Sequence, residues 1–150
     1  MKTIKHQIEI KQNQADVFDL TQDYSKRLEW DTYLSEAYLL GGAKTADVGV
    51  DSLCKNKSGS IMISRYISFN RPNVAAVTMV KGPFILSRFS GAWNVKRIDD
   101  MKSLLIFTYH FELKGGFFGK ILLPIVTHLF SKDMKKRLIS IKSYIENKNK

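Results

Sequence analysis

The residue with the sharpest chemical implication is Arg65, which lies in the alternating segment 61–69 (Ile-Met-Ile-Ser-Arg-Tyr-Ile-Ser-Phe). Apart from Arg65, the odd positions of this segment are apolar. If that parity faces the interior of a sheet, the guanidinium enters an apolar space. A buried charge without a partner is costly, so Arg65 would then need an anionic ligand or a protein carboxylate. A bulge or an edge position would instead turn Arg65 to solvent, and the sequence leaves both arrangements open.

Aromatic side chains on two successive predicted strands form a second group of candidates. Phe89 and Trp93 share one face of the first strand, and Tyr109 and Phe111 face the same interior from the next. Rings with polar tips suit a pocket that is apolar and still orients its ligand. The same rings would serve equally well to fill a core. Trp30, expected at the mouth beside two short helices, has the same two interpretations.

The C-terminal segment 117–147 is predicted to be one long helix with an apolar stripe that faces the sheet. The stripe recurs at spacings of three and four: Leu123, Val126, Phe130, Met134, Leu138, Ile141 and Ile145. Val126, Phe130 and Met134 are its candidate ligand contacts. Together with the inner faces of the last strands, they are expected to line a pocket of roughly several hundred Å³.

The first half of this helix carries additional apolar residues away from the stripe. Ile121 and Ile125 point nearly opposite to it, and apolar residues on an outward face need a cover. The two short helices, a second copy of the chain in a homodimer, or peripheral contact with a membrane would each supply one. Alternatively, a kink at Pro124 would rotate the first turns into the core.

Metal, cofactor and nucleophile chemistry find no support in the pattern. His6, His110 and His128 lie in three separate predicted elements, and no pair of ligands has a spacing typical of zinc sites. Cys54 has no recognisable catalytic partner, and a single half-buried thiol is typical of packing. The sequence therefore predicts no metal and no cofactor, and identifies no catalytic residue.

These candidates are positioned by elements that the hydrophobic periodicity outlines. Strands are expected at 3–11, 33–40, 48–56, 60–69, 74–81, 86–98 and 103–113, and helices at 14–21, 25–29 and 117–147. Strands this close together, with no helices between them, pair antiparallel. The predicted fold class is therefore α+β: a curved seven-stranded antiparallel sheet around a long C-terminal helix, with two short helices after the first strand.

Length and composition indicate a single domain spanning residues 1–150. The net charge of +10 is carried by basic residues spread along the chain, with one cluster at Lys132, Lys135, Lys136 and Arg137. No nucleic-acid-binding motif accompanies them, which argues against specific nucleic-acid recognition. Because Cys54 is alone and the N-terminus has no apolar signal region, the expected location is cytoplasmic.

Several stretches resemble a known superfamily. They include Arg27-Leu28-Glu29-Trp30-Asp31, Gly91-Ala92-Trp93 and the run from Phe118 to Pro124, followed by Lys136-Arg137-Leu138. Over nearly its whole length the chain resembles the START-like superfamily (SRPBCC), in its polyketide cyclase/dehydrase and lipid-transport branch. The resemblance implies the helix-grip fold. It does not select an activity, because these motifs are structural.

The resulting hypothesis is that the protein binds or carries a small hydrophobic ligand, such as a lipid, an isoprenoid or a polyketide-like molecule, in an internal cavity. One alternative is a cyclase or dehydratase acting on a polyketide-like substrate, and another is a partner-binding module without a ligand. An enzyme needs an acid or base within reach of its substrate. The sequence places only Arg65 and Tyr109 inward, with no carboxylate beside them, so whether the protein is an enzyme stays open.

Overall fold

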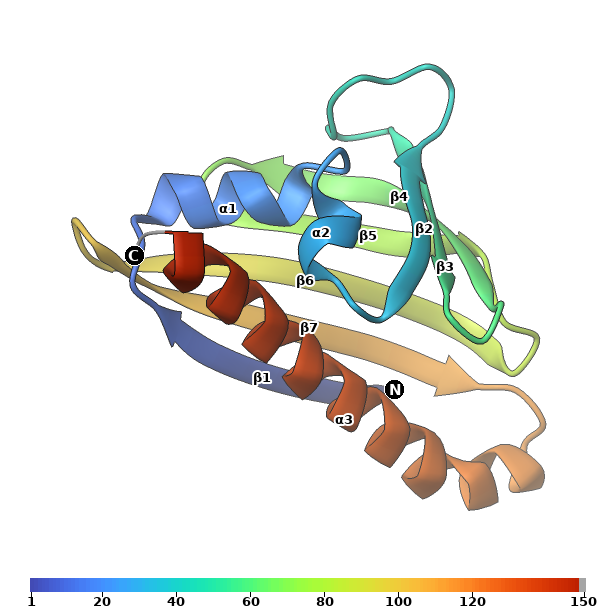
Figure 1. Cartoon of the computed structure of the whole chain (residues 1–150). Coiled ribbons are helices and arrows are strands. Elements are labelled where there is room, and N and C mark those ends of the chain that lie inside the picture. The colour runs from blue at the N-terminus through green and yellow to red at the C-terminus, as the bar shows by residue number, and fades with distance from the viewer. Residues whose placement is uncertain (149–150) are drawn as a thin grey trace.

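The computed structural model describes residues 1–148, which form seven strands and three helices (Figure 1). Strand β1 (Lys2–Ile10) leads into two short helices, α1 (Gln14–Gln22) and α2 (Arg27–Trp30). The remaining strands are β2 (Leu34–Leu39), β3 (Asp51–Asn56), β4 (Ile61–Asn70), β5 (Val74–Lys81), β6 (Leu86–Asp99) and β7 (Lys102–Leu113). Helix α3 (Phe117–Lys148) completes the described chain.

All strands belong to one antiparallel sheet in the order β1-β7-β6-β5-β4-β3-β2. Helices α1 and α2 make the long connection from β1, at one edge of the sheet, to β2, at the other. The sheet curves, and α3 runs diagonally across its concave side (Figure 1). The predicted α+β class and the helix-grip architecture are confirmed.

Local chemistry explains where the helices lie. The side chain of Asn13 caps α1 by accepting a hydrogen bond from the backbone N–H of Asp16 at 2.9 Å. The second half of α3 buries a stripe at spacings of four, three and four: Met134, Leu138, Ile141 and Ile145. Burying each of these side chains stabilises the fold by roughly 1.5–3 kcal/mol, which fixes this half of α3 on the sheet.

Pro124 lies inside α3, and the helix is continuous through it. The alternative in which a kink turns the first half of α3 into the core is wrong, because Ile121 is 53% exposed and Ile125 is 56% exposed. The first turns of α3 extend past the sheet at the lower right of Figure 1. Within residues 1–148, no helix has an apolar stretch long enough to cross a membrane.

Candidate functional site

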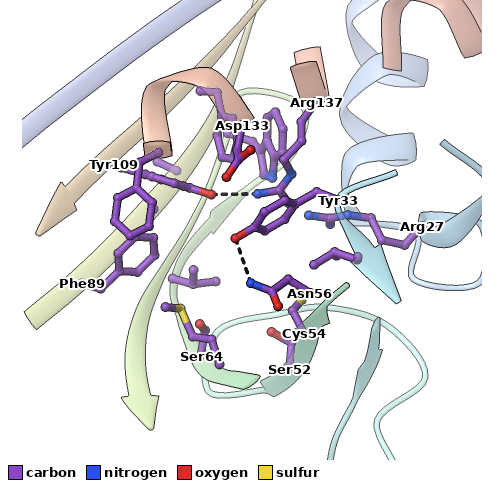
Figure 2. Close-up of a pocket in the computed structure, with 18 of the residues that line it drawn as sticks. Arg27, Tyr33, Ser52, Cys54, Asn56, Ser64, Phe89, Tyr109, Asp133 and Arg137 are labelled. Atoms are coloured by element: carbon purple, nitrogen blue, oxygen red, sulfur yellow. Dashed lines mark hydrogen bonds between the residues drawn. The ribbon is translucent and has the colours of Figure 1, made fainter. Parts of the chain in front are cut away.

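A cavity of about 160 Å³ lies between the concave face of the sheet, α2 and the middle of α3 (Figure 2). It is smaller than the several hundred Å³ expected from the sequence. For scale, an engineered apolar cavity of about 150 Å³ holds a benzene molecule. The space therefore suits one or two rings, or part of a longer molecule.

One wall of the cavity is aromatic and comes from β6, β7 and α3. The rings of Trp93 and Phe107, which are directly paired across β6 and β7, stack at 3.7 Å between centroids with an interplanar angle of 6°. Tyr109 packs edge-on against Phe89 at 4.7 Å and against Phe130 at 5.7 Å. These contacts hold each ring in one orientation, so the wall is preformed.

A glycine makes room for this wall. Gly91 is paired with Tyr109 across β6 and β7, and both residues line the cavity. A Cβ atom at Gly91 would lie 3.4 Å from the Tyr109 ring, at the close limit of ordinary van der Waals contact. The Tyr109 ring thus packs directly over Gly91, with its hydroxyl pointing toward α3 (Figure 2).

Of the nine predicted site residues, four line the cavity and five do not. The four in the lining are Phe89, Trp93, Tyr109 and Phe130. Three are buried outside its lining: Trp30, Phe111 and Met134. Val126 is half-buried against the core and also lies outside the lining. Trp30 packs edge-on against Trp93 at 6.2 Å, and its indole N–H has no hydrogen-bond partner within residues 1–148.

The inward placement of Arg65 is wrong. Its side chain is 52% exposed on the outer face, where its Nε and Nη2 atoms donate to the two carboxylate oxygens of Asp51 at 2.7 and 3.0 Å. The opposite parity of β4 faces the cavity, with Met62, Ser64 and Tyr66 in its lining. Asp51, paired with Arg65 on β3, neutralises the guanidinium outside the fold.

A buried ion cluster lies where Arg65 was expected to act. Asp31, just after α2, is completely buried between two guanidiniums that both line the cavity. Arg27 donates from Nε to Asp31 at 2.8 Å, and Arg137 of α3 donates from Nη2 to the same carboxylate oxygen at 2.8 Å. Both arginines are more than nine-tenths buried. The cluster has two positive charges and one negative charge.

Hydrogen-bond capacity remains in this cluster. Arg137 donates from Nη1 to the hydroxyl of Tyr109 at 2.7 Å, which links the ion cluster to the aromatic wall (Figure 2). Arg27 uses Nε and one Nη1 hydrogen, the latter on the backbone oxygen of Thr21 at 3.2 Å. The Nη2 atom of Arg27 has no hydrogen-bond partner within the described chain. A guanidinium presents five N–H donors, so the cluster can still bind an acceptor.

The protonation of this cluster follows from its geometry. Burial by itself would raise the pKa of Asp31, but Arg137 and Arg27 outweigh burial and hold that pKa below its ordinary value. Burial also opposes the charge on Arg137, yet Tyr109 and Asp31 keep its pKa raised. Burial raises the pKa of the Tyr109 hydroxyl. At neutral pH the cluster is therefore a carboxylate, two guanidiniums and a neutral phenol.

The wall formed by β3 and β4 is more polar. Ser52, Cys54 and Ser64 line it, and the amide of Asn56 donates to the Tyr33 hydroxyl at 3.1 Å. Burial raises the pKa of the Cys54 thiol, which keeps it protonated and a poor nucleophile. This wall can provide hydroxyl and amide contacts to a ligand but has no activated nucleophile.

A chain of hydroxyls closes the side of the cavity next to α1. The Tyr24 hydroxyl is 2.8 Å from that of Tyr66, which donates to the side-chain oxygen of Gln22 at 2.6 Å. All three residues line the cavity. Burial raises the pKa of Tyr66, so its hydroxyl stays protonated at neutral pH.

Asp133 is the only carboxylate among the residues that line the cavity, within the chain that the structure describes. It lies one turn before Arg137 on α3 and is half-buried, beside the aromatic wall (Figure 2). Position 133 lies off the apolar stripe of the C-terminal helix, so helical periodicity gives no signal for a carboxylate in the cavity. A carboxylate in the lining can move a proton only where it comes within hydrogen-bond reach of the bound molecule.

The three histidines lie apart. His6 of β1 shares a hydrogen bond with Ser131 of α3 at 2.7 Å, and His110 of β7 shares one with Thr3 at 2.8 Å. His128 is exposed on α3. Among residues 1–148, no three His, Cys, Asp or Glu side chains converge in a group that could hold a metal ion.

Comparison with known proteins gives a consistent result. The profile of the family described as polyketide cyclase/dehydrase and lipid transport matches residues 1–146. A search of curated proteins gave no significant match. Among solved structures, the Zhui aromatase/cyclase from Streptomyces sp. R1128 has a TM-score of 0.81 at 14% identity, covering 99% of this chain and 96% of that one.

Two further structures have the same fold. Norcoclaurine synthase from Thalictrum flavum has a TM-score of 0.75 at 14% identity, with 99% of this chain and 96% of that chain covered. A START superfamily protein from Mycobacterium smegmatis has a TM-score of 0.65 at 11% identity, with 91% and 96% covered. The chain therefore belongs to the polyketide cyclase/dehydrase and lipid transport family.

Proposed function

We propose that the protein binds a small, largely apolar molecule in this cavity and releases it unchanged, as a carrier or receptor does. The observation that carries this proposal is the preformed aromatic wall of Trp93, Phe107 and Tyr109, which ends at the buried guanidinium of Arg137. Apolar lining with a few convergent polar groups is typical of small-molecule sites. A cytoplasmic location is part of the same proposal.

The chemistry of the walls narrows the ligand class. A lipid, an isoprenoid and a polyketide-like molecule all offer an apolar body with few oxygens. Two guanidiniums share one buried carboxylate, so a ligand oxygen with negative charge, such as an enolate, phenolate or carboxylate, would be favoured at Arg137. The proposed ligand has an apolar ring or chain against Trp93 and an acidic oxygen near Arg137 and Tyr109.

A cavity-filling variant tests the binding proposal. Val77 of β5 lines the cavity, whereas Val80 of the same strand is 50% exposed. We expect 1-naphthol, as a two-ring probe, to bind the wild-type protein in calorimetry. Val77→Phe should weaken binding by at least about tenfold, and Val80→Phe should change it by less than about twofold.

Native mass spectrometry of the protein purified from cells supplies a second readout. A discrete bound molecule that is displaced by 1-naphthol, and is absent from the Val77→Phe variant, is the expected result. An empty wild-type protein that also gives no heat with 1-naphthol would contradict the proposal and leave a partner-binding module as the better interpretation.

Catalysis is the second candidate, and the position of Asp133 in the lining favours it. A cyclase or dehydratase would use Asp133 to move a proton while Arg137 and Tyr109 stabilise charge on an oxygen. Dehydration removes one water from the bound molecule, so its mass falls accordingly. Conversion of the co-purified molecule by the wild-type protein, and not by Asp133→Asn, would establish this alternative over simple binding.

The exposed start of α3 suggests that the protein also contacts a larger partner. Its exposed apolar residues, including Ile121 and Ile125, would be covered by contact with a bilayer or with a second copy of the chain.

A further inference from the structure

The three most exposed large apolar side chains of the described chain lie at one end of the molecule. Phe84, in the turn between β5 and β6, is 88% exposed. At the start of α3, Phe117 and Phe118 are 73% and 72% exposed, and Ile121 and Ile125 are more than half exposed. We call these five residues the apolar tip. A cluster of exposed rings of this kind marks a surface that contacts something other than water.

The two segments of the apolar tip are fastened to each other. The backbone N–H of Lys114 donates to the carbonyl of Ile85 at 2.8 Å, and the Lys114 ammonium lies 5.1 Å from the centroid of the Phe84 ring. Gly119 is buried in the turn, where an added Cβ would lie 2.6 Å from the carbonyl oxygen of Lys114. The conformation of the apolar tip is therefore fixed by contacts between a tight turn and the start of α3.

The charge around the apolar tip is predominantly positive. The segments 81–88 and 114–122 contain Lys81, Arg88, Lys114 and Lys120 and no acidic residue, and Glu112 of β7, 3.8 Å from Arg88, offsets one of these four charges. Exposed rings surrounded by lysine and arginine are complementary to an anionic bilayer, where the rings enter the interface and the cations meet the lipid phosphates. Two copies of the chain meeting tip to tip would instead bring like charges together, which disfavours a second copy as the partner.

The cavity reaches this end of the molecule. Pro83 and Leu86, on either side of Phe84, line the cavity, and Phe130 of α3 closes the same wall. A bilayer at the apolar tip would thus lie beside the cavity, at the short distance that exchange of an apolar molecule with lipid requires.

We propose that the apolar tip docks the protein on the surface of an anionic lipid bilayer, with Phe84, Phe117 and Phe118 in the interface and the end of the cavity next to the lipid. This contact is peripheral and reversible, because its anchor is a few side chains and a set of lysines. It is independent of the ligand, so docking on empty vesicles is expected whether or not the cavity is filled.

Flotation with phosphatidylcholine vesicles, with and without phosphatidylserine, tests the proposal on the whole chain. The wild-type protein should float with the phosphatidylserine vesicles and much less with phosphatidylcholine alone, and added salt should weaken the binding. The tip variant Phe84→Ser plus Phe117→Ser should lower the ratio of bound to free protein by at least about tenfold.

Two matched variants control for loss of apolar surface and of charge. Ile67 and Val80 are about half exposed on β4 and β5, and Ile67→Ser plus Val80→Ser should float as the wild type does. Lys114→Gln plus Lys120→Gln should reduce flotation, whereas the same change at the exposed Lys26 and Lys44 should have less effect.

The outcomes separate a bilayer from a second copy. Absence of wild-type flotation, or equal flotation of the tip variant and the Ile67/Val80 control, would overturn the proposal. A dimer in analytical ultracentrifugation that the tip variant abolishes, without flotation, would assign the surface to a second copy. Because all the substituted side chains are exposed, circular dichroism should show every variant folded.

Discussion

Two aspartate–arginine contacts on opposite faces of the sheet show how burial changes the meaning of the same chemistry. Asp51 accepts two hydrogen bonds from Arg65 on the outer face, where the arginine is half exposed. Asp31 accepts from Arg27 and Arg137 on the inner side and has no exposed surface. Both are charge-assisted contacts of nearly the same length. They differ in what surrounds them.

This difference in burial indicates which of the two contacts stabilises the fold. An exposed ion pair exchanges water for its partner with little net gain. Removing one member of a buried pair leaves an uncompensated charge in a poorly solvated site, which is far more costly. Two guanidiniums depend on the single carboxylate of Asp31, so this residue holds α2, α3 and the cavity wall together.

The largest effect is expected for Asp31→Asn, which keeps the shape of the side chain and removes its charge. Arg27 and Arg137 would then be buried as unneutralised like charges. We expect the free energy of unfolding to fall by about 3–5 kcal/mol, measured by urea denaturation. The matched control, Asp51→Asn, should leave the denaturation midpoint close to that of the wild type. Equal losses in the two variants would show that burial is not what distinguishes the pairs.

A smaller effect is expected for Tyr109→Phe, which removes the hydroxyl that accepts from Arg137. The guanidinium then lacks one acceptor in the cavity wall, and the free energy of unfolding should fall by about 1–3 kcal/mol. Tyr38→Phe is the control, because Tyr38 is 45% exposed on β2. A loss for Tyr109→Phe no greater than that of the control would indicate that water replaces the hydroxyl without cost.

The fold could be predicted from the sequence more completely than the candidate site. The periodicity of 134, 138, 141 and 145, and the alternation in 103–113, predict the helix and the last strand well, because burial on one face imposes those periods. Both parities of segment 61–69 contain apolar residues, so periodicity could not decide which face Arg65 occupies. The structure settles that through the pairing of Arg65 with Asp51.

Arg137 was missed for a different reason. It follows Lys135 and Lys136, and a run of basic residues is more often typical of a solvated surface than of a buried site. Its position, three residues after Met134 and four before Ile141, nevertheless places it on the buried stripe. That spacing was the signal available in the sequence. The partner could not be found the same way, because Asp31 lies more than a hundred residues earlier in the chain and only the fold brings it to Arg137.

The pH dependence provides a prediction of intermediate size. The pKa of Asp31 is lower in the folded protein than the unfolded value of about 3.9. A carboxylate with a depressed folded pKa contributes stability above its unfolded pKa and loses it as the pH falls through the folded value. We therefore expect Asp31 to titrate below about pH 3.9 in carboxyl NMR, with stability falling by up to about 1.4 kcal/mol per pH unit there. A titration midpoint at or above 3.9 would show that the two guanidiniums do not outweigh the effect of burial on the pKa of Asp31.

The smallest effect is expected for Arg65→Met, and its contrast with Arg137→Met tests the assignment of the site. Arg65 lies on the outer face and does not line the cavity. Its loss should therefore leave the urea midpoint close to that of the wild type. The affinity for 1-naphthol should change by less than about twofold. Arg137 donates to Tyr109 inside the cavity, so Arg137→Met should weaken 1-naphthol binding by about tenfold, as expected for the loss of one charge-assisted hydrogen bond to the probe hydroxyl. Arg137→Met will also lower stability, so binding is compared at a temperature where circular dichroism shows both variants folded. If Arg65→Met weakened binding as much as Arg137→Met, the ligand would have to contact the outer face, and the cavity would no longer be the site.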